Sequence, residues 1–357
     1  YDSVDWIEQP LATKVQNVNE FHVVEYVGYV SIEPKADTWV RVIRLPGVSG
    51  TRTRTSGRGA VIRRVVRTRR RDQVVGTGAE QFMRQRNIYF DAANIKPLTR
   101  TYHFLDNNGN LDFIPKLLEI CKTKEGDPGS VGTFQVGETV ISYDDSGAER
   151  GRFRICTGNH KKGAFNNPTK TYNINPYIKT ENLSSIYSES TKVLNVDVRS
   201  MAAHSQGSYW GYVKKNHKLV GQTSGAVAFI KDLRSISDNY GDLIGSVFIR
   251  NPHTPTPPPE RISTGTKAFK LTTSPTNATP LPGSKLISSA ETTYTATGTW
   301  QMRRTVTTTT IIWRRYDPIA QSFTVGQTIQ APSGTVNPND VNDDTSGAFL
   351  TAVDLFF

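Results

Sequence analysis

Hydrophobic and polar residues alternate in short runs along most of this chain. Segments such as residues 21–32 (FHVVEYVGYVSI) and 139–143 (TVISY) combine Val, Ile, Tyr and Phe, and clusters of Gly or Asn separate them. This pattern is typical of many short strands rather than of alternating strands and helices. Further strands are predicted at 88–90, 101–105, 133–136, 152–155, 226–230, 246–249, 267–271 and 293–297.

Helical patterns are rare in the sequence. The best is FIPKLLEICK at 113–122, in which Pro115 would occupy the first turn. A second lies around Ser200. The predicted fold class is therefore mainly β, with several small β-sandwich or barrel-like domains, extended linkers and few helices.

Proline-rich and polar segments divide the 357 residues. They predict an N-terminal β domain over 1–110, a middle, mostly β domain over 111–251, a Pro-rich spacer at 252–259 and a C-terminal β domain over 260–357. The spacer, PHTPTPPP, is expected to be extended and stiff. Ile319, 322–325 and 349–357 are expected to share one β-sandwich-like module.

Composition narrows the class of protein further. No apolar run approaches the roughly 20 residues of a membrane span, so no membrane association is expected. Cys121 and Cys156 allow one disulfide at most, which excludes a disulfide-stapled scaffold and suits synthesis in a reducing compartment. The chain begins at Tyr1 without an initiator Met, and we interpret it as part of a longer protein.

Charge is concentrated in one place. The chain holds 43 Lys and Arg against 32 Asp and Glu, a net charge of +11. Eleven of these basic residues are arginines between Arg41 and Arg71, a window without Lys or acidic residues. The rest of the chain is neutral. The sequence thus describes a neutral protein that carries one all-Arg block.

The Arg block requires a partner of negative charge. Guanidinium groups suit both phosphates and carboxylates. The second half of the block, VIRRVVRTRRRDQVV, mixes Val and Ile with Arg, as a wide β-ribbon would. The block has no interleaved aromatic residues and no helical periodicity, which favours an acidic protein neighbour over nucleic acid, with a solvated face as a further alternative. The predicted subunit-interface residues are Arg52, Arg54, Arg58, Arg63, Arg64, Arg67, Arg69, Arg70 and Arg71.

Catalytic and metal-binding motifs are missing from the sequence. The six histidines lack the spacing of a helical zinc site, and no nucleophile elbow, Walker loop or dinucleotide fingerprint occurs. DNNGNLD at 106–112 offers oxygen ligands at alternate positions, but its Gly is misplaced for a calcium loop, and an Asn-Gly turn is the favoured interpretation. We therefore expect that the protein is not an enzyme and that it binds no cofactor and no metal.

Several sequence blocks together resemble a known family. They are FHVVEYVGYVSIEPKADTWV at 21–40, MRQRNIYFDAANIKPLTRTYHFLD at 83–106, SGAVAFIKDLRSISDNYGDLIGSVFIRNP at 224–252, ISTGTKAFKLTTSPTNATPLPG at 262–283, and WRRYDPIAQSFTV at 313–325 with GAFLTAVDLFF at 347–357. In this order they are similar to the large virion structural proteins of T4-like contractile-tailed bacteriophages, described as baseplate wedge or tail-fibre-associated subunits.

The resemblance implies a structural subunit of a phage tail, in the baseplate wedge. Its partners would be other tail and baseplate proteins and copies of itself in a large symmetric assembly, and its location the virion after synthesis in the bacterial cytoplasm. Thr-rich strands such as 305–313 are expected to expose edges that pair with another chain. The alternatives are a tail-fibre, neck or other tail-associated protein, a nucleic-acid-binding protein that uses the Arg block, and a tailspike-like glycan hydrolase.

Overall fold

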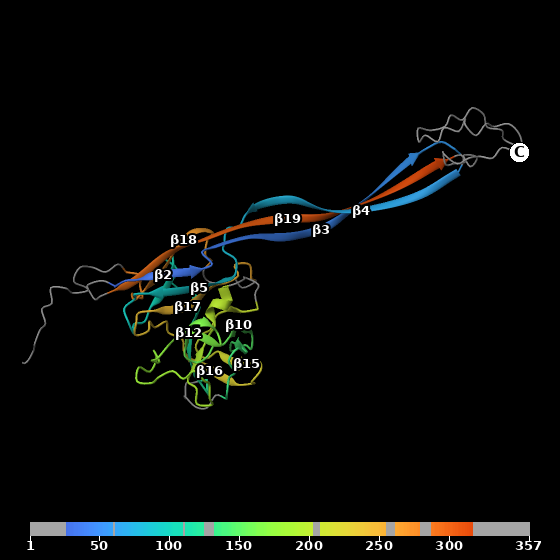
Figure 1. Ribbon diagram of the computed structural model, residues 1–357. Coiled ribbons are helices and arrows are strands. Elements are labelled where there is room, and N and C mark those ends of the chain that lie inside the picture. Colours follow the sequence, from blue (N-terminus) through green and yellow to red (C-terminus); the bar gives the residue numbers. More distant parts are fainter. Residues whose placement is uncertain are drawn as a thin grey trace, which may run out of the picture. The chain divides into compact units, whose positions relative to one another are not determined.

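The computed structural model describes residues 26–59, 61–109, 111–124, 132–202, 208–254, 261–278 and 287–316. Strands dominate these residues (Figure 1). The chain divides into two compact units, neither continuous in sequence. The first unit comprises Tyr1–Val42 and Thr77–Gln301, and the second, which we call the ribbon unit, comprises Ile43–Gly76 and Met302–Phe357.

One antiparallel sheet lies at the centre of the first unit, in the order β2-β5-β17-β7. Its strands are β2 (Tyr29–Glu33), β5 (Arg86–Ala93), β17 (Leu243–Ile249) and β7 (Asp112–Pro115). All seven residues of β17 are buried. Alternate side chains point to opposite faces of a strand: Val247 packs into one hydrophobic core and Ile244 into a second.

The first core fills the space between this sheet and a six-stranded one. In the six-stranded sheet the order is β1-β19-β18-β6, and β3 and β4 also pair with β19. Its strands are β1 (Tyr26–Val27), β19 (Ser288–Tyr316), β18 (Gly265–Thr272), β6 (Tyr102–Leu105), β3 (Ala36–Ser56) and β4 (Val61–Ala79). Phe90 from β5 meets Phe269 from β18 with ring centroids 5.8 Å apart, and Tyr294 from β19 is buried beside them. These two layers form a β-sandwich.

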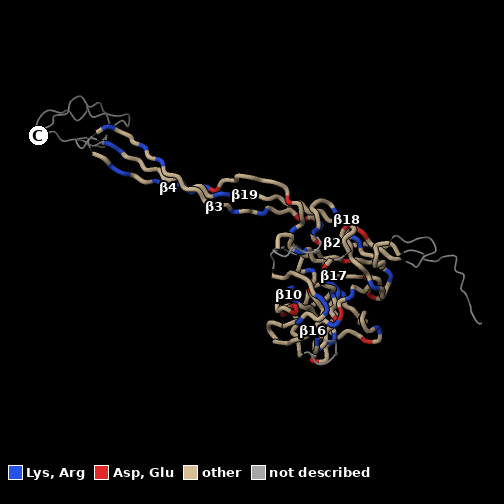
Figure 2. The backbone as a smooth tube through the Cα atoms, turned by 180° about the vertical axis from the view of Figure 1, so that it is seen from behind, with Lys and Arg blue, Asp and Glu red and all other residues tan. Residues whose placement is uncertain are grey.

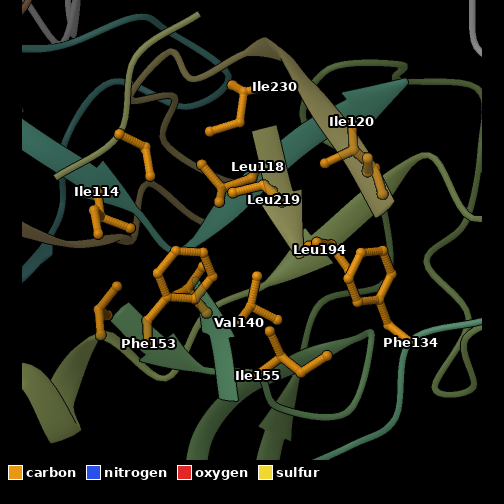
Figure 3. Packing of buried hydrophobic residues seen from close by; sticks show 14 of the residues in the cluster. Ile114, Leu118, Ile120, Phe134, Val140, Phe153, Ile155, Leu194, Leu219 and Ile230 are labelled. Carbon is orange, nitrogen blue, oxygen red and sulfur yellow. The ribbon is translucent and has the colours of Figure 1, made fainter. Parts of the chain in front are cut away.

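The second core lies inside a seven-stranded sheet in the order β13-β8-β16-β15-β9-β10-β14. Its strands are β13 (Val193–Asn195), β8 (Leu117–Cys121), β16 (Val227–Asp232), β15 (Lys218–Gly221), β9 (Thr139–Tyr143), β10 (Glu149–Arg154) and β14 (Trp210–Gly211). The ends of β10 and β13 meet, because Asp197 N donates to Arg154 O at 2.9 Å and Cys156 N to Asn195 O at 2.8 Å. The sheet therefore closes into a small barrel, filled by Leu118, Phe153 and Leu219 among others (Figure 3).

Two small elements complete the description. The strands β11 (His160–Ala164) and β12 (Asn167–Thr171) form a two-stranded sheet, and η1 (Val198–Ala202) is a short 3-10 helix. Cys121 and Cys156 are buried and are not joined in a disulfide. The mainly β fold class, with sandwich-like and barrel-like parts, is thus confirmed.

Three local predictions need correction. The helix expected at 113–122 is two strands, β7 and β8, separated at Lys116. The chain passes from one sheet to another at that residue, and each strand gains cross-strand hydrogen bonds that outweigh the weak helix propensity. The helix around Ser200 is only η1, and TFQV at 133–136 is irregular chain that inserts Phe134 into the barrel core.

A turn follows β6 as predicted, but its central residues are Asp106 and Asn107 and not the predicted Asn-Gly pair. Leu105 and Asn108 exchange two backbone hydrogen bonds, and Asp106 has a φ of 52°, a left-handed conformation that Asp tolerates. The Asp106 carboxylate accepts from Ala268 N at 2.9 Å and pairs with Lys267 at 2.8 Å. The Asp106 carboxylate therefore connects the turn after β6 to strand β18.

Some expectations lie outside the described residues. They concern the prolines at 255–259 and the C-terminal module around Ile319, 322–325 and 349–357. The predicted boundaries at 110/111, 251/252 and 259/260 differ from the division into two units, which falls at 42/43, 76/77 and 301/302.

His103 makes the stability of the first unit dependent on pH. Its ring lies 4.6 Å from the Phe113 ring and 5.2 Å from the Phe90 ring, and Nε2 is 2.8 Å from Ser235 Oγ. Burial lowers the pKa of His103 to about 3, whereas the unfolded chain takes up this proton near pH ~6.5. Stability is therefore complete above about pH 6.5 and is lost as the pH falls toward 3, by about 1.4 kcal/mol per pH unit.

Chemical denaturation between about pH 7 and about pH 4 measures this dependence. His103→Gln removes the titrating group, so its unfolding free energy should fall less steeply with pH than that of the wild type. Identical slopes for the two proteins would contradict the assignment, whatever the difference in their absolute stability.

Candidate interaction surface: the arginine ribbon

The ribbon unit is a three-stranded sheet with β19 between β3 and β4. Thr68 Oγ1 lies 3.5 Å from Thr309 Oγ1, and Thr305 Oγ1 donates to Asp72 Oδ1 at 2.7 Å. The partner of Thr68 is Thr309 and that of Asp72 is Thr305, so residue numbers rise along β4 while they fall along β19. The two strands therefore run antiparallel. Gly47 of β3 lies against Thr305, and Gly57, which directly follows β3, lies against Arg315, so β3 and β19 run parallel. A late strand is thus inserted between two early ones.

This arrangement corrects the expectation for 305–313. Both edges of that segment face strands of the same chain, β3 on one side and β4 on the other. In the described part of the chain, the outer edges of β3 and β4 pair with no further strand. Among the described strands of the ribbon unit, the edges available to another chain are therefore those of the Arg-bearing strands β3 and β4.

The ribbon unit is one layer thick over its described residues. None of the described side chains in 43–76 and 302–315 is buried, and those of β19 are half-buried at 302–312 and exposed at 313–315. Val48, Ile62 and Val66 are 49–54% exposed, although apolar strand residues normally face a core. Within its described residues, this unit has apolar side chains but no second layer to cover them.

Alternation along β4 separates its arginines onto two faces. The Arg64 guanidinium lies 5.9 Å from the centre of the Trp313 ring, on the face that Thr68 and Asp72 share. The opposite face therefore carries Arg63, Arg67, Arg69 and Arg71. Neighbours on one face of a strand are about 7 Å apart. The result is a regular row of positive charge.

The described residues of the ribbon unit carry charge of almost one sign. Residues 43–76 and 302–316 contain fourteen Arg and no Lys, with Asp72 as the single acidic residue. Figure 2 shows these basic positions along β3, β4 and β19. Within the described residues, none of the nine predicted interface arginines forms an ion pair.

The nine predicted residues lie together. Arg52 and Arg54 belong to β3, Arg58 follows it, and the other six belong to β4. The sequence prediction missed the contribution of β19, which adds the pairs at 303–304 and 314–315 to the same sheet. These Arg pairs are visible in the sequence on either side of the Thr-rich run. Only the pairing of β19 with β4 shows that they lie beside residues about 240 positions earlier.

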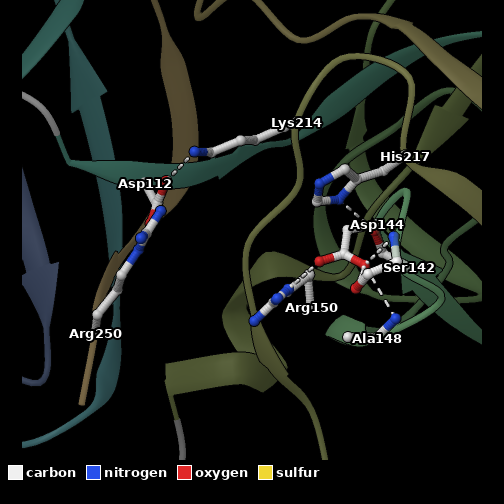
Figure 4. Close-up of polar contacts among 9 residues, drawn as sticks. Asp112, Ser142, Asp144, Ala148, Arg150, Lys214, His217 and Arg250 are labelled. Carbon is white, nitrogen blue, oxygen red and sulfur yellow. Dashed lines mark hydrogen bonds and ion pairs between the residues drawn. The ribbon is translucent and has the colours of Figure 1, made fainter. Parts of the chain in front are cut away.

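A buried Ser–His pair has the hydrogen-bond distance of a catalytic dyad. Ser142 Oγ of β9 lies 3.0 Å from His217 Nδ1 (Figure 4). The nearby Asp144 carboxylate accepts instead from Ser146, Ala148 and Arg150, and the Ser146 and Arg150 bonds help hold its pKa well below the usual range. Ser142 is completely buried and burial lowers the pKa of His217, so this pair supports the barrel and has no room for a substrate.

The described residues offer neither a metal-binding cluster nor a membrane-spanning helix. Among the described residues, no group of three His, Cys, Asp or Glu side chains is placed to bind a metal ion. The described part of the chain also has no helix with the length and apolarity needed to span a membrane. Comparisons with protein-family models, curated proteins and solved structures find no match.

Arginines of the two units should respond differently to substitution. The triple change of Arg67, Arg69 and Arg71 to Ser should alter the unfolding free energy by less than about 0.5 kcal/mol per residue, because these side chains are exposed and make no ion pair with the described residues. Arg86→Ser should cost about 1–3 kcal/mol, since Arg86 donates to Asp37 at 2.6 Å and to Ala202 O at 3.1 Å and is only 10% exposed. Thermal and urea unfolding measure both, and a large loss in the triple variant would show that the ribbon arginines stabilise the fold.

Proposed function

We propose that this protein is a structural subunit of a contractile bacteriophage tail, in the baseplate wedge, and that it binds the acidic surface of a neighbouring subunit through the arginine ribbon. The observation that carries the proposal is the sheet of β3, β4 and β19, one layer thick over its described residues, in which the nine predicted interface arginines form no ion pair with described residues. The resemblance of the sequence blocks to phage virion proteins supplies the biological setting. A tail-fibre or neck position would use the same surface.

A partner would complete the ribbon in three ways. It would cover Val and Ile side chains that face solvent on the ribbon, at about 25 cal/mol per Å² of apolar area. It would pair carboxylates with guanidiniums in bidentate geometry. It could also add a strand to the outer edge of β3 or β4 through backbone hydrogen bonds. Each contribution favours an acidic, strand-bearing protein.

Two ribbons are poor partners for each other. Like charges about 7 Å apart repel by roughly 0.6 kcal/mol even in bulk water, and the repulsion grows where water is excluded. Residues 43–76 and 302–316 of each ribbon carry fourteen such charges against one Asp. Contacts between copies of the chain would therefore use other surfaces, and the ribbon would bind a different subunit.

Assembly in infected cells tests the proposed function. Changing Arg63, Arg64, Arg67, Arg69, Arg70 and Arg71 to Ser should stop tail assembly at an intermediate, while the purified chain still folds. The matched variant with Lys at the same six positions keeps the charge but loses the planar bidentate geometry, so it should rescue assembly only in part. Electron microscopy of lysates and mass spectrometry of purified virions report the outcome. Normal virions from the Ser variant, or virions that lack the protein, would refute the proposal.

Binding to DNA separates the proposal from the nucleic-acid alternative. A phosphate grip without base contacts weakens by orders of magnitude between about 50 mM and about 200 mM salt. Duplex binding by the wild-type chain should therefore be weak at about 200 mM salt and indifferent to sequence. Tight or sequence-selective binding under that condition would favour a nucleic-acid-binding protein.

A further inference from the structure

A buried lysine in the first unit lies between two carboxylates. Lys161 Nζ is 2.5 Å from Asp238 Oδ2 and 2.6 Å from Asp242 Oδ2. The Lys161 and Asp238 side chains are only 5% and 6% exposed. Lys161 belongs to β11, whereas both aspartates lie in the turn that leads into β17. The three groups thus join segments 77 positions apart in sequence.

The two oxygens of Asp238 have different surroundings. Oδ1 accepts backbone hydrogen bonds from Tyr240 N at 2.9 Å and Asp242 N at 2.8 Å, while Oδ2 faces the amine. The Tyr172 and Tyr240 rings lie 5.7 Å and 5.4 Å from Lys161 Nζ. An amine, a carboxyl group, two fixed N–H donors and a second carboxylate therefore meet in a place with little water.

We propose that Lys161 and Asp238 become joined by an intramolecular isopeptide bond, an amide between Lys161 Nζ and Asp238 Cγ, with Asp242 as the catalytic residue that moves the proton. This inference does not depend on the function proposed above. The groups have the roles that acyl transfer requires: a nucleophile, an electrophile, an oxyanion site and a base.

The reaction balances without any further reagent. The site begins as an ammonium beside two carboxylates. Asp242 Oδ2 takes one proton from the ammonium, and Asp238 Oδ2 takes a second as the nitrogen attacks Cγ. The backbone N–H groups of Tyr240 and Asp242 stabilise the negative charge that develops on Asp238 Oδ1. The C–Oδ2 bond then breaks, the proton on Asp242 passes to the departing oxygen, and one water molecule leaves. Asp242 is returned to its starting state.

The local environment favours condensation over a permanent ion pair. Two opposite charges held away from water cost desolvation free energy, and the neutral amide removes that cost. The carbonyl oxygen of the amide, Asp238 Oδ1, keeps both backbone donors. Asp242 is 20% exposed, which gives the released water a route to solvent. The bond would tie the β11–β12 hairpin permanently to the turn before β17.

The mass of the denatured wild-type chain tests the proposal directly. It should be lower than the sequence mass by one water molecule. After trypsin digestion, cleavage should fail after Lys161, and a branched peptide should contain both Lys161 and Asp238. Lys162 is the internal control: it pairs with the single carboxylate of Asp91 at 2.7 Å, and cleavage after it should proceed.

Variants identify the chemistry. Lys161→Arg keeps the ion pairs but has no amine, and Asp242→Asn keeps the Lys161–Asp238 pair but cannot accept the proton. Both should show the full sequence mass, and both should melt at a lower temperature than the wild type because the unfolded chain loses its cross-link.

Three results would overturn the inference. The first is a wild-type chain of full sequence mass. The second is a loss of water that maps to a succinimide at an aspartate, without a branched peptide. The third is a cross-link that forms equally fast and completely in Asp242→Asn, which would remove the proposed role of Asp242.

Discussion

A sheet that is one layer thick has no interior, and the character of the ribbon unit follows from this constraint. In its described residues the strands are held by backbone hydrogen bonds to β19, and none of the side chains there is buried in a hydrophobic core. The described Val and Ile side chains between the arginines are exposed, so a complex would cover them and would bring carboxylates to the arginines. The ribbon is therefore better suited to an assembly than to an isolated chain.

In the first unit, the apolar faces of the sheets are covered by other parts of the same chain. It stacks one sheet on another and closes a third into a barrel, so that strands such as β17 are covered on both faces. Charged groups that become buried there have partners: Asp37 has Arg84 and Arg86, and Lys161 has two carboxylates. The last of these clusters is where burial and proximity also favour covalent chemistry.

Much of the fold was predictable because β-strands depend on local alternation. Residues 139–143 form β9 as predicted, and 267–271 lie within β18. The helix at 113–122 failed because its apolar residues serve two different sheets on either side of Lys116, which no local pattern reveals. The site was predicted in part. The Arg block was visible from composition, but the strand that completes it, β19, lies more than 200 residues away.

The sequence by itself determined that this protein is mainly β and carries one block of unopposed positive charge, because periodicity and net charge are properties of consecutive residues. The tertiary structure alone decided which strands are neighbours, since pairing depends on backbone hydrogen bonds between distant segments. It also decided which face of β4 each arginine occupies, and that Lys161 meets Asp238 and Asp242. Such contacts between distant residues depend on the closure of long loops and on the exclusion of water, and no short segment of the sequence predicts either of them.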